Sequence, residues 1–424
     1  MTPVSPRRSR RDELRNLVAR SRLVVFWSAA TGVATGLMVA GFDRLTVNVV
    51  LERVRNGPLL FVAFAPGLGL LLATLWLRGP GRGVSPATAD SYLAAYHGGG
   101  ELEVRPALHR VIASFATLAF GGAMGLEGPS LYMGATTGAW TQRRFGRFLP
   151  GADRNVLMVA GAAAGVAAIF KAPATGAIFA LEVPYQDDLA RRMLLPALVA
   201  SAAGYLSFVA VNGTKPLFAI SGTPPFSFKD LAGAVLLGVT AGVGARAFAW
   251  LLRRAKALNN TVPVAWRVLG ATAVLAGLFA IARGLTGRSL TIGPGYEVIG
   301  WALSPNRSVP LVLAVLLVRC VATATVVGGG GAGGLFVPLV VAGALLGRVF
   351  GGAFGDQTSL FVVIGVAAFL GAGYRVPLAA VMFVAESTGR PGFVVPGLLA
   401  AVAAELVMGR SSVTAYQSPP PLDD

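Results

Sequence analysis

The sequence predicts an all-α protein that crosses a membrane several times and consists of two related halves with broken helices. Hydrophobic residues make up 54% of the 424 residues and charged residues only 13%, which is too apolar for a soluble globular protein. Glycine (55 residues) and proline (26 residues) interrupt the apolar segments and indicate broken helices. Several apolar runs reach the roughly 20 residues that a helix needs to cross a bilayer. These runs are residues 23–42, 57–77, 193–211 and 231–251.

Basic residues gather at the start of the chain rather than in one folded patch. The net charge of +17 could suit a nucleic-acid-binding protein, but many of the positive residues lie in the first 22 residues and in short loops. Seven arginines precede the first apolar run, and positive residues flanking a span favour the cytoplasmic side. We therefore expect residues 1–22 to be a basic, unfolded cytoplasmic tail, and the partner to be a lipid bilayer rather than nucleic acid.

Cysteine and histidine are too scarce for a metal or redox centre. The single cysteine, Cys320, has no second cysteine to pair with, and two histidines cannot supply a histidine metal cluster. A membrane-embedded enzyme using Glu127, Glu182 and Glu386 is the alternative from another class, but the sequence has no clear acid cluster or nucleophile with its base. We expect no cofactor, no metal and no enzymatic activity.

Two segments with the same residue pattern divide the chain into halves. Residues 170–182 and 374–386 both have an aromatic residue, a cation, any residue, a proline, then a phenylalanine and a final glutamate. Corresponding segments interrupted by glycine and proline indicate a transport site between two repeats. We expect a first membrane repeat over 23–212, a second over 230–417, and a disordered tail over 418–424.

A glycine-rich break that ends in proline precedes each repeated segment. These breaks are Gly125-Leu-Glu-Gly-Pro129 and the longer run over 328–338. Proline favours a helix start, and glycine lets the backbone approach an ion closely. The N–H groups of a helix N-terminus bind an anion with partial charge, whereas a full positive charge would trap it. The two breaks therefore predict one anion site between two helix starts.

Glu127 places a carboxylate inside the first break. A carboxylate at membrane depth costs several kcal/mol unless a positive environment or a proton compensates it, so Glu127 is a functional candidate. It could occupy the anion site itself and leave when protonated. A helix cap is the structural alternative for Glu127. For Glu182 and Glu386, which end apolar runs, a structural role is as well supported as a functional one.

Three ordered motifs resemble those of the CLC family of chloride channels and chloride/proton exchangers. Residues 125–129 are similar to Gly-(Arg/Lys)-Glu-Gly-Pro, residues 333–338 to Gly-Gly-x-Phe-x-Pro, and residues 170–182 to Phe-x-Ala-Pro-x-x-Gly-x-x-Phe-x-x-Glu. The resemblance covers about residues 20–417. It implies the CLC fold of two inverted-topology repeats, without regulatory cytoplasmic domains, and a homodimer in a bacterial inner membrane. It also implies transport of chloride or a similar anion, by a voltage-gated-type channel or a proton antiporter.

The resemblance also assigns roles to particular residues. Glu127 corresponds to the gating glutamate, Glu182 is a candidate for the proton path, and Phe336 lines the anion path. The backbone N–H groups of both helix starts are expected to hold the anion: those of Leu126, Glu127, Gly128, Leu335, Phe336 and Val337.

Two further elements match the family only loosely. Residues 81–86 are a weak match to Gly-Ser-Gly-Ile-Pro, so Arg82 or Ser85 is expected at the anion, unless Arg82 only reaches to the membrane interface. The hydroxyl that the family places in the pore is supplied either by Tyr416 or, in an ungapped match, by Thr414.

Two positions differ from the family pattern in ways that bear on mechanism. Leu126 replaces the usual basic residue before the glutamate, which makes the surroundings of Glu127 less positive. Val183 stands where exchangers carry a second glutamate for proton transfer. The sequence therefore leaves open a chloride channel, a chloride/proton antiporter and a fluoride/proton antiporter.

Overall fold

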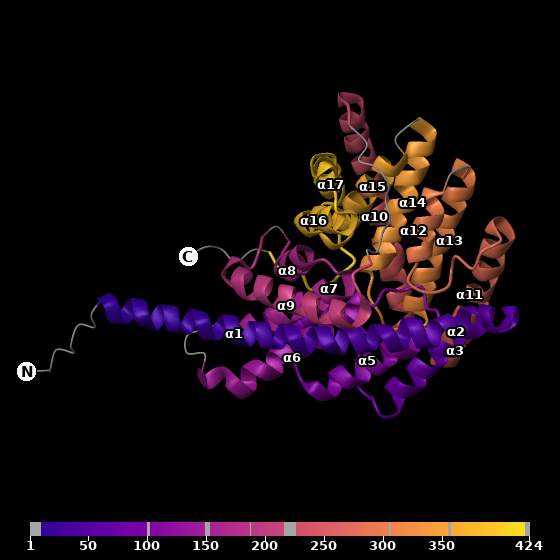
Figure 1. The fold of residues 1–424 in the computed structure, drawn as a ribbon. Helices are drawn as coiled ribbons and strands as arrows, with labels where there is room; N and C mark the ends of the chain where they lie inside the picture. The colour runs from indigo at the N-terminus through magenta and orange to yellow at the C-terminus, as the bar shows by residue number, and fades with distance from the viewer. Residues whose placement is uncertain are drawn as a thin grey trace, which may run out of the picture.

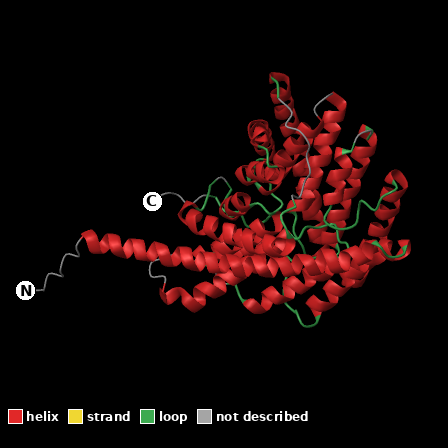
Figure 2. Cartoon of the chain, in the orientation of Figure 1, coloured by secondary structure: helices red, strands yellow, loops and turns green. Residues whose placement is uncertain are grey.

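The computed structural model describes residues 10–99, 102–148, 153–186, 188–215, 226–304, 307–354 and 358–419. Helices make up most of this part of the chain, and it contains two isolated bridges but no β-strand (Figure 2). The predicted all-α class is confirmed.

The helices follow one another in two halves, which Figure 1 colours from indigo to magenta and from pink to yellow. The first half contains α1 (Arg10–Asp43), η1 (Arg44–Leu51), α2 (Glu52–Arg55), α3 (Leu59–Arg78), α4 (Ala89–His97), α5 (Val104–Ala119), α6 (Glu127–Phe145), η2 (Gly146–Phe148), α7 (Val156–Phe170), α8 (Pro173–Glu182), η3 (Arg191–Met193) and α9 (Leu194–Asn212). The second contains α10 (Phe228–Thr261), α11 (Val264–Thr286), α12 (Tyr296–Leu303), α13 (Val309–Gly328), α14 (Phe336–Phe354), α15 (Thr358–Tyr374), α16 (Pro377–Thr388), η4 (Pro391–Phe393) and α17 (Val394–Met408).

Long and short helices have different surroundings. In the described residues, 8 helices are long and apolar enough to cross a membrane. The 15 residues of α7 extend only about 22 Å, which is less than the roughly 30 Å of a hydrocarbon core. Every residue of α7 is buried, and so is α15 from Leu360 onward. These two helices are thus enclosed by protein, where helix ends at membrane depth can find polar partners.

The two halves repeat the same close helix contact. In the first half, Gly134 of α6 lies so near α7 that an added Cβ would overlap the carbonyl oxygen of Gly161. In the second, a Cβ added at Gly343 of α14 would likewise overlap the carbonyl oxygen of Gly365 in α15. Because glycine allows the backbones to approach, each half holds the helix that follows its glycine-rich break against a buried partner.

The N-terminal helix is longer than predicted. α1 begins at Arg10, so the expectation of an unfolded tail over 1–22 is wrong from Arg10 onward. Residues 10–22 are rich in Arg and Leu, which favour helix. Residues 1–9 lie outside the described part, as do most of the residues between the two predicted repeats.

The C-terminal segment is tied to the first half. The Gln186 N–H donates to the Ser418 carbonyl at 2.9 Å, and the Ser418 N–H donates to the Pro184 carbonyl at 3.2 Å. The disordered tail predicted for 418–424 is therefore wrong at Ser418, because two backbone hydrogen bonds hold it. Residues 420–424 lie outside the described residues.

A buried arginine in α13 anchors the loop before α12. Arg319 is 3% exposed and donates to the carbonyl oxygens of Leu290 (3.2 Å), Gly293 (3.1 Å) and Pro294 (2.7 Å). The Gly293 N–H in turn donates to the Gly121 carbonyl at 2.8 Å, just before the first glycine-rich break. Arg319 therefore helps to position that break through the loop.

We expect Arg319→Met to lower the free energy of unfolding by about 3 kcal/mol, because buried carbonyl groups lose charge-assisted hydrogen bonds. Chemical unfolding of the detergent-solubilised protein measures the change. The matched control is Arg283→Met, at an exposed position of α11. Equal stability of the two variants would contradict the anchoring role of Arg319.

Candidate anion site

Glu127 joins the two helix starts that the glycine-rich breaks predict. It is the first residue of α6 and is 4% exposed. Its Oε1 accepts the N–H of Phe336 at 2.5 Å and that of Val337 at 3.3 Å, both at the start of α14. Its Oε2 has no hydrogen-bond partner among the described residues. The carboxylate therefore takes backbone donors that could hold an anion.

The two breaks are hydrogen-bonded to each other. The Gly125 N–H donates to the Gly334 carbonyl at 2.9 Å, and the Gly334 N–H donates to the Gly125 carbonyl at 2.7 Å. A Cβ added at either glycine would overlap the Glu127 carboxylate. Glycine is thus required at both positions by close approach, and the pair sets the distance between the two helix starts.

A third helix start approaches the same place. Thr88 is buried and immediately precedes α4, and its hydroxyl donates to the Gly333 carbonyl at 3.4 Å. A Cβ at Gly128 would overlap the Thr88 hydroxyl oxygen. Thr88 is therefore the side chain of the α3–α4 connection that reaches the two breaks.

The structure places Arg82 and Ser85 farther out in that connection. Arg82 is exposed in the turn that follows the end of α3 at Arg78, which agrees with the alternative that it reaches to the membrane interface. Ser85 lines a cavity beside the breaks, where its hydroxyl accepts the Ala87 N–H at 3.2 Å.

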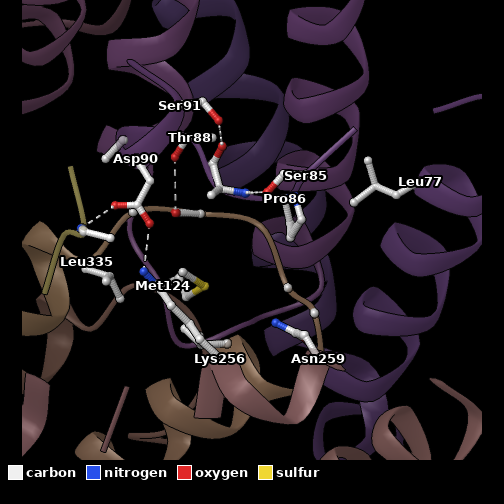
Figure 3. Close-up of a pocket in the computed structure, with 18 of the residues that line it drawn as sticks. Leu77, Ser85, Pro86, Thr88, Asp90, Ser91, Met124, Lys256, Asn259 and Leu335 are labelled. Atoms are coloured by element: carbon white, nitrogen blue, oxygen red, sulfur yellow. Dashed lines mark hydrogen bonds and ion pairs between the residues drawn. The ribbon is translucent and has the colours of Figure 1, made fainter. Parts of the chain in front are cut away.

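That cavity has a volume of about 850 Å³ and reaches the breaks at Gly333, Gly334 and Leu335. Figure 3 shows Thr88, Met124 and Leu335 around its inner part. The same view shows Asp90 of α4 paired with Lys256 of α10 at 2.8 Å. Asp90 also accepts the Ala415 N–H at 3.3 Å, so this wall joins both halves to the C-terminal segment.

Among the hydroxyl side chains that line the cavity, Tyr416, Thr414 and Tyr374 lie at different depths. Tyr416 is 53% exposed, and the Thr414 hydroxyl lies 3.0 Å from that of Ser412. Tyr374 is only 2% exposed, and its ring centroid lies 6.5 Å from that of Phe336. Sequence reasoning missed Tyr374 as a site residue. The sequence did contain a clue to Tyr374. It is the aromatic residue at the start of the second repeated segment, in the position that Phe170 has in the first.

An aromatic cluster surrounds Phe336. Its side chain is fully buried, with ring centroids of Phe170, Phe383 and Phe179 at 4.2, 5.0 and 5.4 Å. These three residues belong to the two repeated segments. The repeats therefore pack around the residue whose N–H binds Glu127.

Glu182 and Glu386 form reciprocal caps between the halves. Glu182 accepts the N–H groups of Leu378 (3.1 Å) and Ala379 (2.8 Å) at the start of α16. Glu386 accepts the N–H groups of Ala174 (2.9 Å) and Thr175 (2.7 Å) at the start of α8, and the Thr175 hydroxyl at 2.6 Å. Each carboxylate thus satisfies the free donors of a helix start in the other half. This geometry favours the structural role that the sequence left open for both glutamates.

Comparisons with known proteins agree with the family resemblance that the three sequence motifs indicate. The sequence profile of voltage-gated chloride channels matches residues 69–409. The H(+)/Cl(-) exchange transporter ClcA of Yersinia pseudotuberculosis serotype IB is 27% identical over 93% of this chain and 87% of the relative. ClcA of Salmonella paratyphi A is also 27% identical, over 94% of this chain and 88% of the relative.

Solved structures share the fold. A slow cyanobacterial Cl⁻/H⁺ antiporter has a TM-score of 0.80 at 21% identity, covering 91% of this chain and 94% of the other. A CLC-type fluoride/proton antiporter has a TM-score of 0.79 at 21% identity, covering 94% and 98%. These likenesses confirm the expected CLC fold and, with the 8 apolar helices, a multi-pass membrane protein.

We expect Glu182→Ala and Glu386→Ala each to lower the free energy of unfolding by about 2 kcal/mol, because each leaves buried helix-start N–H groups unpaired. Unfolding in detergent measures this loss. Glu297→Ala is the control, since that carboxylate is largely exposed in its ion pair with Arg55. Wild-type stability of both cap variants would contradict the structural role.

Proposed function

This chain belongs to the voltage-gated chloride channel family, and from that membership we propose that it carries chloride or a similar small inorganic anion across the membrane. The observation that carries the proposal is the binding of the buried Glu127 carboxylate by the first N–H groups of α14. A site that holds a carboxylate in this way has the donors for a free anion. The relatives are named as transporters, which speaks against the alternative of a membrane enzyme.

Glu127 is the gate in this proposal. The carboxylate and the anion compete for the N–H groups of Phe336 and Val337. A proton on Oε2, the oxygen without a partner in the described residues, removes the negative charge and weakens the hydrogen bonds of the group. The neutral side chain can then leave the helix start to the anion. Anion binding and proton binding are linked through this one carboxyl group.

The names of the relatives favour exchange of an anion for protons as the form of transport, because both are called H(+)/Cl(-) exchange transporters. Val183 supplies no acid on the inner side, and both oxygens of Glu182 are engaged at α16. A proton must therefore reach Glu127 by another acid or through water in the cavity. A channel remains the alternative, and the likeness to a fluoride/proton antiporter makes fluoride the second anion to test.

Family membership and the N-terminal arginines support a proposal for the assembly and the orientation. We propose a homodimer with a separate pore in each subunit, located in a bacterial inner membrane. The arginines before the first span support a cytoplasmic N-terminus. Cysteine cross-linking in membranes and labelling of an N-terminal tag from either side test these two points.

Liposome flux tests the proposed function directly. The purified protein is reconstituted in chloride-loaded vesicles, and external chloride and pH are recorded together, with and without a potassium ionophore. Chloride efflux with opposite proton movement supports the exchanger, and chloride efflux without protons supports the channel. If neither wild type nor Glu127→Gln moves chloride, the chloride assignment is wrong and fluoride is measured next.

We expect Glu127→Gln to make anion flux independent of pH and to abolish proton movement, because the amide is neutral at every pH. Wild-type flux should rise as pH falls, by at most about tenfold per unit for one titrating group. The readout is flux between pH 4.5 and 7.5 (a range of about three units chosen to bracket carboxyl titration). Glu297→Gln controls for loss of a carboxylate elsewhere. Retained pH dependence in Glu127→Gln would exclude this glutamate as the gate.

We expect Tyr374→Phe to weaken anion binding about tenfold, because a buried hydroxyl that lines the cavity is lost as a donor. Tyr416→Phe should have little effect, since water can replace this exposed hydroxyl. Isothermal titration with chloride measures both variants. If Tyr416→Phe weakens chloride binding more than Tyr374→Phe does, Tyr416 rather than Tyr374 supplies the hydroxyl at the anion.

A further inference from the structure

An apolar groove lies between α3 and α11, which pack side by side at one edge of the molecule (Figure 1). It has a volume of about 650 Å³. The leucines Leu71 and Leu75 of α3 and Leu269 of α11 line it, and they are 43%, 58% and 60% exposed. Both helices are long enough to cross the membrane. The groove therefore faces the hydrocarbon of the bilayer.

The groove joins the 850 Å³ cavity at one end. Thr74, Arg78 and Val264 line both spaces. Arg78 is the last residue of α3, and Val264 is the first residue of α11. Both helices thus reach the edge of their spans at this junction, which is the depth of the lipid headgroups.

Two guanidinium groups lie at the junction without a countercharge. Arg267 lines the cavity near Arg78, and a Cβ added at Gly330 would lie 2.9 Å from its Nη2. Its Nη1 donates to the Asn259 carbonyl at 3.3 Å, and its Nε has no partner among the described residues. Among the described residues neither arginine has an ion pair, and the nearby Asp90 is paired with Lys256.

We propose that this junction binds an anionic glycerophospholipid, with its phosphate on Arg78 and Arg267 and one acyl chain along the groove. Guanidinium groups match phosphate oxygens in bidentate geometry, and basic pockets between membrane helices bind anionic headgroups. A free inorganic anion would use the arginines but not the groove. A zwitterionic lipid would use the groove but gain little from the arginines. Only an anionic lipid is complementary to both features.

Native mass spectrometry of the full-length protein tests the proposal without any measurement of transport. The protein is titrated with phosphatidylglycerol or phosphatidylcholine carrying the same acyl chains. We expect phosphatidylglycerol to be retained preferentially. The double variant Arg78→Gln/Arg267→Gln should bind it about thirtyfold more weakly, from the loss of two basic contacts. Leu71→Trp keeps both arginines but fills the groove, and it should weaken binding about tenfold.

Matched controls lie on α11 or just after its last residue, Thr286. Arg283→Gln/Arg288→Gln removes the same charge at the far end of α11, and Leu285→Trp places a tryptophan at another exposed position of this helix. Both controls should bind phosphatidylglycerol like the wild type. Unfolding midpoints verify that all variants are folded.

Three results would overturn the proposal. Equal retention of the two lipids would exclude recognition of an anionic headgroup. Full binding by Leu71→Trp, with loss in the arginine variant, would mean that the arginines attract anions without a seated chain. Displacement of phosphatidylglycerol by an equal concentration of inorganic phosphate would assign the site to a free oxyanion instead.

Discussion

The structure depends on how one buried carboxylate is compensated inside an apolar protein. Glu127 is almost fully enclosed, and an isolated carboxylate there would cost several kcal/mol. The N–H groups that offset this cost belong to α14, in the other half of the chain. Both halves must therefore start a helix inside the protein at the same point. The Gly125–Gly334 pair brings these starts together, and only glycine leaves space for the carboxylate between them.

Helices that begin inside the protein expose free N–H groups, and three glutamates satisfy those groups in different ways. Glu182 and Glu386 use both carboxylate oxygens, and each caps a helix of the opposite half. Glu127 uses one oxygen, while the other has no partner among the described residues. Glu127 and Glu182 each accept two backbone N–H groups, but Glu182 uses both oxygens and Glu127 uses only Oε1. What distinguishes Glu127 from the two caps is therefore the oxygen that has no partner in the described residues, and the proposed gating places the proton on this oxygen.

The sequence predicted those features that local chemistry encodes. Glycine and proline mark the two helix starts directly, and apolar length marks the spans, so the fold class and Glu127 could be recognised. The α3–α4 connection has no periodicity to fix its register, so the sequence did not indicate that Thr88, just before α4, contacts Gly333. The reciprocal caps depend on contacts about 200 residues apart. Glu182 and Glu386 occupy the same position in the two repeated segments, which indicated that the two residues are equivalent. This equivalence did not show which residues each glutamate contacts.

The distribution of positive charge around Glu127 bears on the gating role proposed for it. Leu126, next to Glu127, is apolar and 1% exposed, and no ion pair of Glu127 occurs in the described residues. In the described residues the carboxylate is thus held by the backbone N–H groups of Phe336 and Val337 rather than by a full positive charge. Cationic side chains lie instead on the cavity wall, where Lys256 is paired with Asp90 and Arg267 lies at the proposed lipid site. The narrow site therefore offers an anion the partial charges of helix N-termini, which bind it without trapping it.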